Sequence, residues 1–237
     1  MTGPLFRYAP PIAERFPSVV GGVIHATGLR GGPTPDALLA ALVAEVGAAR
    51  ARIGETPLSD VPSLAAWRRA FRSFGVDPTQ YRSAAEALLR RVTKGADLPS
   101  INVLVDLANL VSVRFALPVA VFDLGAIAGG LTVGVARGDE AWADLGSSTT
   151  EHPAAGEVVF TDQADVVHAR RWCWRQSAAS AASAQTADAL VTVEGHHAGA
   201  TADVSRAVAD LEDLLARFAS PDSMRSAILT AADPAFG

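Results

Sequence analysis

The most hydrophobic stretch of the chain runs from Pro99 to Arg114 and reads PSINVLVDLANLVSVR. At helical spacing its apolar residues cover nearly every side, a pattern that is typical of a buried helix. Asn102, Asp106 and Asn109 form the one exception, because spacings of four and three place them on a single face. A buried polar stripe must be hydrogen-bonded. Taken alone, the stripe is interpreted as structural hydrogen bonding, and the alternative is that it lines a pocket.

Four further helices are predicted from apolar positions that recur every three to four residues. Ser83-Ala-Ala-Glu86 matches a capping box, which predicts that a helix begins there and continues to Val92. Arg68, Arg69 and Arg72 fall on the outer side of one of these helices. We interpret them as a solvated face, with phosphate contact as the less favoured alternative. The predicted helices span residues 36–50, 63–74, 83–92 and 201–218.

Short apolar runs bounded by glycine and polar residues predict strands. Gly129-Gly130 predicts a hairpin between the runs 118–123 and 131–136, and 156–162 is expected to pair with 165–175. Alternation along 165–175 would place His168, Arg170, Trp172 and Trp174 on one face. The other expected strands are 16–27 and 189–194, and the tail after Ser220 has no period and is expected to be partly disordered.

Helices come mainly first and last, and the strands cluster between them. This order favours an α+β fold over a doubly wound sheet. A chain of 237 residues with 49% hydrophobic and 19% charged residues can form one large domain or two small ones. We predict a single domain over residues 1–237.

Charge and cysteine content exclude several classes of protein. A net charge of −5 argues against binding nucleic acid by bulk charge, but it leaves a local basic patch open. A single cysteine, Cys173, excludes an internal disulfide framework and fits a reducing compartment. The N-terminus has no signal-peptide pattern and no apolar run is long enough for a membrane span, so a cytoplasmic protein is expected.

No phosphate loop, dinucleotide fingerprint or paired-cysteine spacing occurs, so neither a cofactor nor a metal is predicted. His196 and His197 are adjacent and would point apart on a strand. Cys173 lies between two tryptophans and is interpreted as a buried, inert thiol. Besides the helical stripe, the polar candidates are Asp123, Glu157, Arg171, Arg175, Gln176 and Ser177. Amides, carboxylates and guanidiniums of this kind can bind a polar zwitterion or ester and position water.

Three runs, YRSAAEALLRR from Tyr81, LPSINVLVDLANLVS from Leu98 and LPVAVFDL from Leu117, resemble the B3/B4 domain. This is the editing domain of the phenylalanyl-tRNA synthetase beta subunit. GEVVFTD from Gly156 and RRWCWRQS from Arg170 are similar to its later part in free-standing form. The resemblance covers residues 16–194. It implies an α+β domain with a central sandwich of strands flanked by helices, and it implies hydrolysis of the ester in a mischarged aminoacyl-tRNA.

Carried over by motif, the resemblance implies that Asn109, Asn102 and Asp106 are catalytic residues. Asp123, at the end of the Pro-x-x-x-Phe-Asp segment, would bind substrate. The same role is expected of the later polar cluster, which comprises Glu157, Arg171, Arg175, Gln176 and Ser177. The chain departs from bacterial synthetases at two positions, where Ala108 replaces a threonine and Ala120 replaces a histidine. In this it resembles the archaeal-type domain.

Three functions therefore stand open. The first is a free-standing deacylase that acts in trans on the aminoacylated 3′ end of tRNA. The second is a module that binds tRNA or an amino acid without hydrolysis. The third is a hydrolase of small amino-acid esters or amides. DNA and membranes are not expected partners. Under the first hypothesis, the stripe on helix 99–114 forms the floor of a cavity for a charged amino acid.

Overall fold

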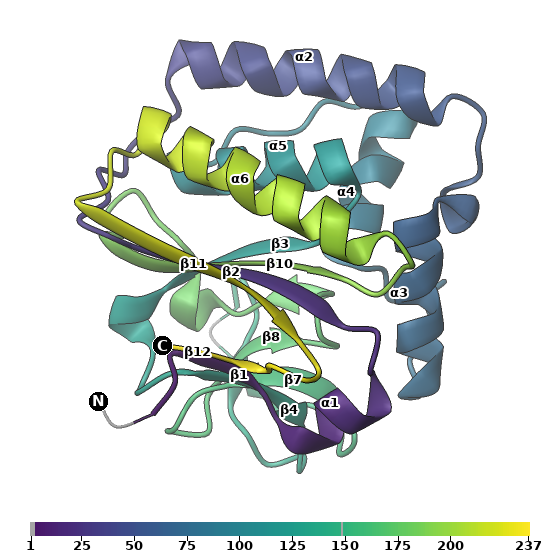
Figure 1. Cartoon of the computed structure of the whole chain (residues 1–237), viewed down its shortest axis with the longest axis vertical. Helices are drawn as coiled ribbons and strands as arrows, with labels where there is room; N and C mark the ends of the chain where they lie inside the picture. Colours follow the sequence, from purple (N-terminus) through teal and green to yellow (C-terminus); the bar gives the residue numbers. More distant parts are fainter. Residues whose placement is uncertain (1–2, 148) are drawn as a thin grey trace.

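The computed structural model describes residues 3–147 and 149–237, and it consists of two packed β-sheets covered on one side by helices (Figure 1). The six-stranded sheet runs in the order β12 (Ala235–Phe236), β1 (Phe6–Tyr8), β4 (Leu131–Val135), β7 (Val158–Thr161), β8 (Val167–Arg170) and β9 (Arg175–Gln176). The four-stranded sheet runs β11 (Ser223–Thr230), β2 (Val20–Thr27), β10 (Asp188–Gly195) and β3 (Val119–Asp123). A small ribbon pairs β5 (Trp142–Ala143) with β6 (Thr150–Glu151).

The helices are α1 (Pro10–Arg15), α2 (Asp36–Ile53), α3 (Pro62–Ser73), α4 (Ala84–Thr93), α5 (Val103–Phe115) and α6 (Ala200–Phe218), with 3₁₀ turns η1 (Leu58–Asp60), η2 (Leu124–Ala126) and η3 (Ala178–Ser180). Figure 1 shows α2, α5 and α6 over the four-stranded sheet, with the six-stranded sheet on its other side. The predicted α+β fold with a central sandwich is confirmed. Among the described helices, none has a stretch of the length and apolarity that a bilayer crossing requires.

Strand β10 explains how a polar site arises inside the sandwich. Val191 and Val193 pack in the core beneath the helices, whereas Leu190 packs in the core between the sheets. Because successive side chains point to opposite faces, Thr192 and Glu194 share the face of Leu190. The central strand therefore directs a hydroxyl and a carboxyl group toward the six-stranded sheet.

Gly21 in β2 allows a tyrosine to reach across the sandwich. A Cβ at this position would lie 2.2 Å from the Tyr8 hydroxyl, closer than any real contact. Without that Cβ, the hydroxyl passes β2 and reaches the Glu194 side chain at 2.7 Å. Glycine at position 21 thus creates room for the buried contact between the two sheets.

The capping prediction at Ser83 is confirmed in its first half. Ser83 is the N-cap of α4, and its hydroxyl accepts a hydrogen bond from the Glu86 backbone N–H. The Glu86 side chain does not return the bond to Ser83 and instead accepts from Arg68 at 2.6 Å. An ion pair with α3 replaces the reciprocal bond of a capping box.

The predicted hairpin at Gly129-Gly130 is wrong, because β3 and β4 lie in different sheets. β4 pairs with β1 and β7 instead. Phe122 from β3 and Leu131 from β4 both enter the core between the sheets, so crossing between sheets buries both runs. The hairpin of β7 and β8 is confirmed.

The tail after Ser220 is ordered into strands, which corrects the expectation of disorder. All eight residues of β11 pair antiparallel with β2, and β12 pairs with β1. Most residues of β11 are partly or fully exposed, so the strand shows little apolar alternation. Backbone pairing with β2 runs along its whole length and leaves little trace in the sequence, although Leu229 packs in the core between the sheets.

Candidate functional site

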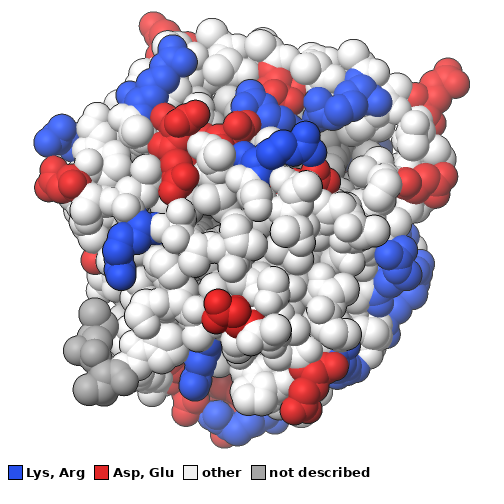
Figure 2. Space-filling model, viewed as in Figure 1, with Lys and Arg blue, Asp and Glu red and all other residues white. Residues whose placement is uncertain are grey.

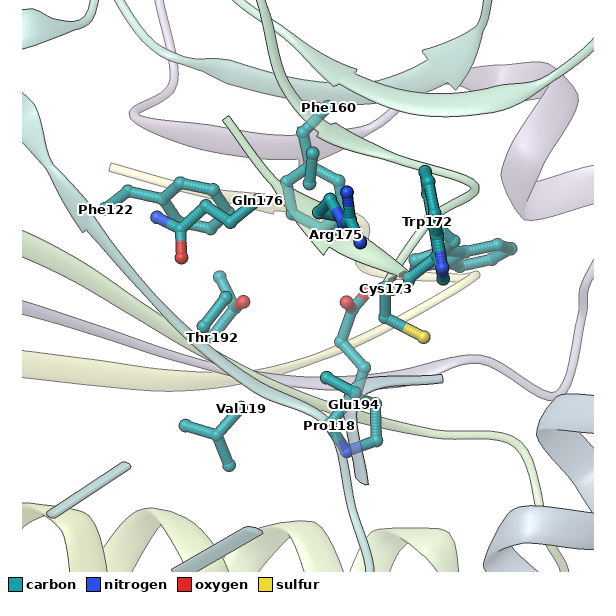
Figure 3. A pocket seen from close by; sticks show the side chains of 14 residues that line it. Pro118, Val119, Phe122, Phe160, Trp172, Cys173, Arg175, Gln176, Thr192 and Glu194 are labelled. Atoms are coloured by element: carbon teal, nitrogen blue, oxygen red, sulfur yellow. Dashed lines mark hydrogen bonds between the residues drawn. The ribbon is translucent and has the colours of Figure 1, made fainter. Parts of the chain in front are cut away.

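A cavity of about 90 Å³ lies between the two sheets (Figure 3). The four-stranded sheet contributes β3 and β10, the six-stranded sheet contributes β7 and β8, and the segment 172–176 closes one side. The walls of the cavity are mainly apolar, with few polar groups, as is usual for ligand sites. The lining residues are Ala84, Pro118, Val119, Ala120, Phe122, Phe160, Ala169, Trp172, Cys173, Trp174, Arg175, Gln176, Thr192 and Glu194.

Among the described residues that line this cavity, Glu194 is the one with a carboxyl group, and its side chain is buried. The Tyr8 hydroxyl and the Trp172 indole N–H both donate to Oε1, at 2.7 Å and 2.9 Å. Within the described residues, Oε2 accepts no hydrogen bond. Figure 3 shows the carboxylate pointing into the space bordered by Thr192, Arg175 and Cys173. One oxygen is thus held in place while the other remains free for a guest.

The protonation of Glu194 is set mainly by burial. Burial raises the pKa of its carboxyl from an ordinary 4.5 to about 7, and the bonds from Trp172 and Tyr8 offset part of that rise. At neutral pH both protonation states are therefore populated. A carboxyl in this condition can accept a proton from water and return it, as general acid–base catalysis requires.

A tight turn places Trp172 against Glu194. Arg171 and Trp172 both adopt left-handed backbone conformations, with φ of 45° and 63°. The chain therefore leaves β8 at Arg170, and the Trp172 backbone N–H donates to Val158 O at 2.7 Å. This corrects the prediction of a continuous strand over 165–175. The alternation expected there does not hold for Trp172 and Trp174.

Cys173 lies on the cavity wall after this turn. Burial raises the pKa of its thiol well above the ordinary value, and the nearby Glu194 carboxylate raises it further. The thiol is therefore protonated at neutral pH and is not an activated nucleophile.

Arg175 and Gln176 are the two sequence-predicted residues that line the cavity. Arg175 is exposed, forms an ion pair with Asp144 and covers the Trp174 ring at 4.7 Å. The Gln176 side-chain amide donates to Val121 O at 2.7 Å and Ser180 O at 3.2 Å. These bonds fix the side chain from its nitrogen and leave its oxygen without a bond inside the described residues.

Asn102 and Asp106 hold the start of α5 in place. Asn102 is the N-cap, accepts from Val105 N at 3.0 Å and donates to Ala182 O at 3.0 Å. Asp106 is fully buried and accepts from Thr34, Ser100 and the Ile101 backbone. The expected cavity floor is therefore wrong for these two residues, because neighbouring groups already use their polar atoms.

Asn109, the third residue of the stripe, is partly exposed on α5. It does not line the cavity, because α5 packs on the opposite face of the four-stranded sheet from Glu194. The catalytic role assigned to the stripe stays a prediction that the fold does not support.

The remaining sequence candidates form structural contacts outside the cavity lining. Asp123 accepts from Gly125 N and from the Thr186 hydroxyl. Glu157 accepts two bonds from Arg170, at 3.0 Å each, and one from the Arg171 backbone. The Arg171 side chain covers the Tyr81 ring at 3.7 Å. Ser177 donates to Ala143 O and caps η3.

Sequence reasoning missed Glu194, Tyr8, Trp172 and Thr192 as members of one site. Glu194 ends an apolar strand, ALVTVE, and its position there was the available signal. Its neighbour His196 packs edge-on against Trp67 and Trp172, and burial lowers the pKa of its ring to about 3. Within residues 3–147 and 149–237, no three His, Cys, Asp or Glu side chains are grouped to hold a metal ion.

Replacing the α5 cap tests its structural role. Asn102→Ala removes the bond to Val105 N and leaves Ala182 O without its donor, so the free energy of unfolding should fall by about 1 kcal/mol. Urea denaturation measures the change. Equal stability of the variant and the unmodified protein would contradict this role.

The raised pKa of Glu194 predicts a pH-dependent stability. Folding favours the protonated carboxyl, so its contribution is complete below pH 4.5 and is lost as the pH rises through about 7. Glu194→Gln keeps an acceptor for Tyr8 and Trp172 but cannot ionise. The stability of this variant relative to the unmodified protein should rise across that interval and level off near 3 kcal/mol, at about 1.4 kcal/mol per pKa unit.

Denaturant unfolding at about pH 5 and about pH 8 measures this difference. A difference between the two proteins that is the same at both values would show that Glu194 has an ordinary pKa.

Comparison with known proteins defines the class to which this fold belongs. The family model described as the B3/4 domain matches residues 66–233. The match covers most of the chain, and the protein belongs to the B3/4 domain family.

A solved structure shares the fold. It is the crystal structure of an N-terminal fragment of the phenylalanyl-tRNA synthetase beta-subunit from Pyrococcus horikoshii, similar with a TM-score of 0.50 and 11% sequence identity. The similarity covers 95% of this chain and 51% of that one, so this chain spans about half the length of the fragment. The search of curated protein sequences gave no match.

Proposed function

We propose that this protein hydrolyses the ester that joins an amino acid to the 3′ end of a mischarged tRNA, acting in trans in the cytoplasm. Membership of the B3/4 family and the likeness to a phenylalanyl-tRNA synthetase fragment support this proposal. The observation that carries it is Glu194, a buried carboxyl with a pKa of about 7, one oxygen of which lies in the cavity between the sheets and accepts no hydrogen bond from the described residues.

The size of the cavity suits the amino-acid part of such a substrate. A water molecule needs roughly 10–15 Å³ of such space, so about 90 Å³ holds a group of several heavy atoms. A nucleoside does not fit in addition. The amino acid would therefore enter, and the ribose and tRNA would remain at the opening near the exposed Arg175.

The residues present can perform the reaction. Glu194 accepts a proton from water while the water oxygen bonds to the ester carbonyl carbon. The bond from this carbon to the ribose oxygen then breaks, and the ribose oxygen takes up the proton. The products are a free amino acid and an intact tRNA hydroxyl. Tyr8 and Trp172 hold the carboxylate, and the Arg175 guanidinium can stabilise negative charge on the carbonyl oxygen.

Ala120 connects the family resemblance to this cavity. The resemblance places a histidine at this position in bacterial synthetases, and Ala120 lines the cavity here. The motif position and the geometry therefore indicate the same pocket. The missing imidazole also favours a second candidate, a module of the same fold that binds an aminoacyl group without hydrolysis.

A panel of mischarged tRNAs, including some with non-protein amino acids, separates the two candidates. The proposal predicts release of free amino acid from at least one of them when purified protein is added. If every tRNA stays intact while one aminoacyl ligand raises the melting temperature, the protein is the binding module.

A further inference from the structure

A second, larger hollow lies beside the cavity and concentrates positive charge. It has a volume of about 450 Å³ and lies between α4, α3 and the segment from Ile53 to Ser59. Four cations line it, Arg68, Arg82, Arg90 and Lys94, against the single carboxylate of Glu86. We call this hollow the basic groove. On a chain with a net charge of −5, such a concentration is a local property that bulk charge does not explain.

Two of these four cations have no carboxylate partner within the described residues. Arg68 lies 2.6 Å from the Glu86 carboxylate and neutralises it, and Arg82 is 3.8 Å from the same group. Arg90 and Lys94 are exposed, and neither has a carboxylate partner within the described residues. The Thr56 hydroxyl also lines the groove, whereas the Ser59 and Thr93 hydroxyls there already donate to Asp60 and to Arg90 O.

The face in Figure 2 provides a contrast. There, acidic and basic side chains are interspersed over α2 and α6, and basic ones gather along the edge where Figure 1 places α3. The basic groove is one place where cations gather on a concave surface. Phosphate oxygens bind such cations, and contacts to phosphates provide most of the affinity of proteins for nucleic acids.

The basic groove begins close to the cavity. Ala84 lines the cavity, whereas Arg82 and Glu86, two residues away on either side, line the groove. Two residues span at most about 7 Å of extended chain. The Ala84 backbone N–H also donates to Cys173 O at 2.7 Å, which ties α4 to the cavity wall. A ligand that fills the cavity is therefore within reach of the groove if its body is a polyanion.

From this adjacency we infer that the basic groove binds the phosphate backbone of an RNA whose 3′ end reaches the cavity. The inference rests on the proposed function and names the surface that would hold the RNA part of the substrate. Arg90 and Lys94 would contact phosphates, and Arg82 would contact the strand nearest the cavity. The alternative role of the α4 cations is structural, because cations stabilise the C-terminal end of a helix.

The test uses a labelled acceptor-stem minihelix with a single-stranded 3′ end and measures its dissociation constant between about 50 and about 200 mM salt. In Arg90→Gln/Lys94→Gln, affinity should fall at least about tenfold at the lowest salt. The slope of log K against log salt should shrink by about 1.4 to 1.8, as expected for two lost phosphate contacts. Arg217→Gln/Arg225→Gln, on α6 and β11, removes the same charge outside the groove and should leave both values unchanged.

The inference would be overturned if both double variants lowered the affinity for the minihelix equally, or if neither lowered it. Hydrolysis separates it from the proposed function. The groove variant should raise KM for an aminoacyl-tRNA but leave hydrolysis of the matching aminoacyl methyl ester unchanged. If the unmodified protein binds the minihelix through the groove but releases no amino acid from any tRNA, the proposed function fails and the inference stands.

Discussion

Glu194→Gln is expected to slow the release of amino acid from a mischarged tRNA by at least about 100-fold. The amide preserves the acceptor for Tyr8 and Trp172 but cannot take a proton from water, and general base catalysis contributes about 10² to 10⁴ in rate. The rate of the unmodified protein should also rise with pH through about 7, as the carboxyl ionises. Single-turnover deacylation across a pH series measures both effects.

Asn109→Ala is the matched control. The family resemblance makes Asn109 the catalytic asparagine, whereas the structure places it beyond the four-stranded sheet from the cavity. We expect turnover within about twofold of the unmodified protein, because substitutions of partly exposed residues away from the site usually have small effects. A large loss in Asn109→Ala with normal turnover in Glu194→Gln would transfer the active site to α5.

Glu157→Gln is expected to lower the free energy of unfolding by about 3 kcal/mol, since the buried Arg170 guanidinium loses its buried carboxylate and keeps only the exposed Glu151 at 3.5 Å. The side chains of Glu157 and Arg170 are 3% and 8% exposed and meet through two bonds of 3.0 Å. This pair supports the turn that places Trp172 beside Glu194, because Glu157 also accepts from the Arg171 backbone N–H.

Asp139→Asn provides the comparison for this prediction. Its ion pair with Arg137 is exposed, with 74% and 58% of the two side chains accessible, and such pairs contribute little. Thermal or urea unfolding should show a much larger loss of stability in Glu157→Gln than in Asp139→Asn. Similar losses in both would show that burial does not set the strength of the Glu157 pair.

Helices α2 to α6 were predictable because their signals are local, whereas the short α1 was missed. Ser83 begins α4 through one hydrogen bond, and the apolar faces of α2 and α6 repeat at helical spacing. Strands β7 and β8 were also predictable, because a short polar connection joins two apolar runs. These features depend on residues that are neighbours in the chain.

The site itself was less predictable because it depends on distant residues. Glu194 meets Tyr8 across 186 positions, and Gly21 must lack a side chain for that contact to form. The polar stripe on α5 was wrongly predicted to form a cavity floor. Thr34 and Ala182, both remote in sequence, form hydrogen bonds with Asp106 and Asn102 instead. A polar stripe shows that partners exist, but it does not show whether those partners are protein or ligand.

A crystal structure with a non-hydrolysable 3′-aminoacylamino-adenosine tests the central claim most directly. We expect the aminoacyl group to lie in the cavity between the sheets, within hydrogen-bond distance of Glu194 Oε2, with the adenosine outside near Arg175. Density for the ligand against α5, next to Asn109, with the inter-sheet cavity empty would contradict it.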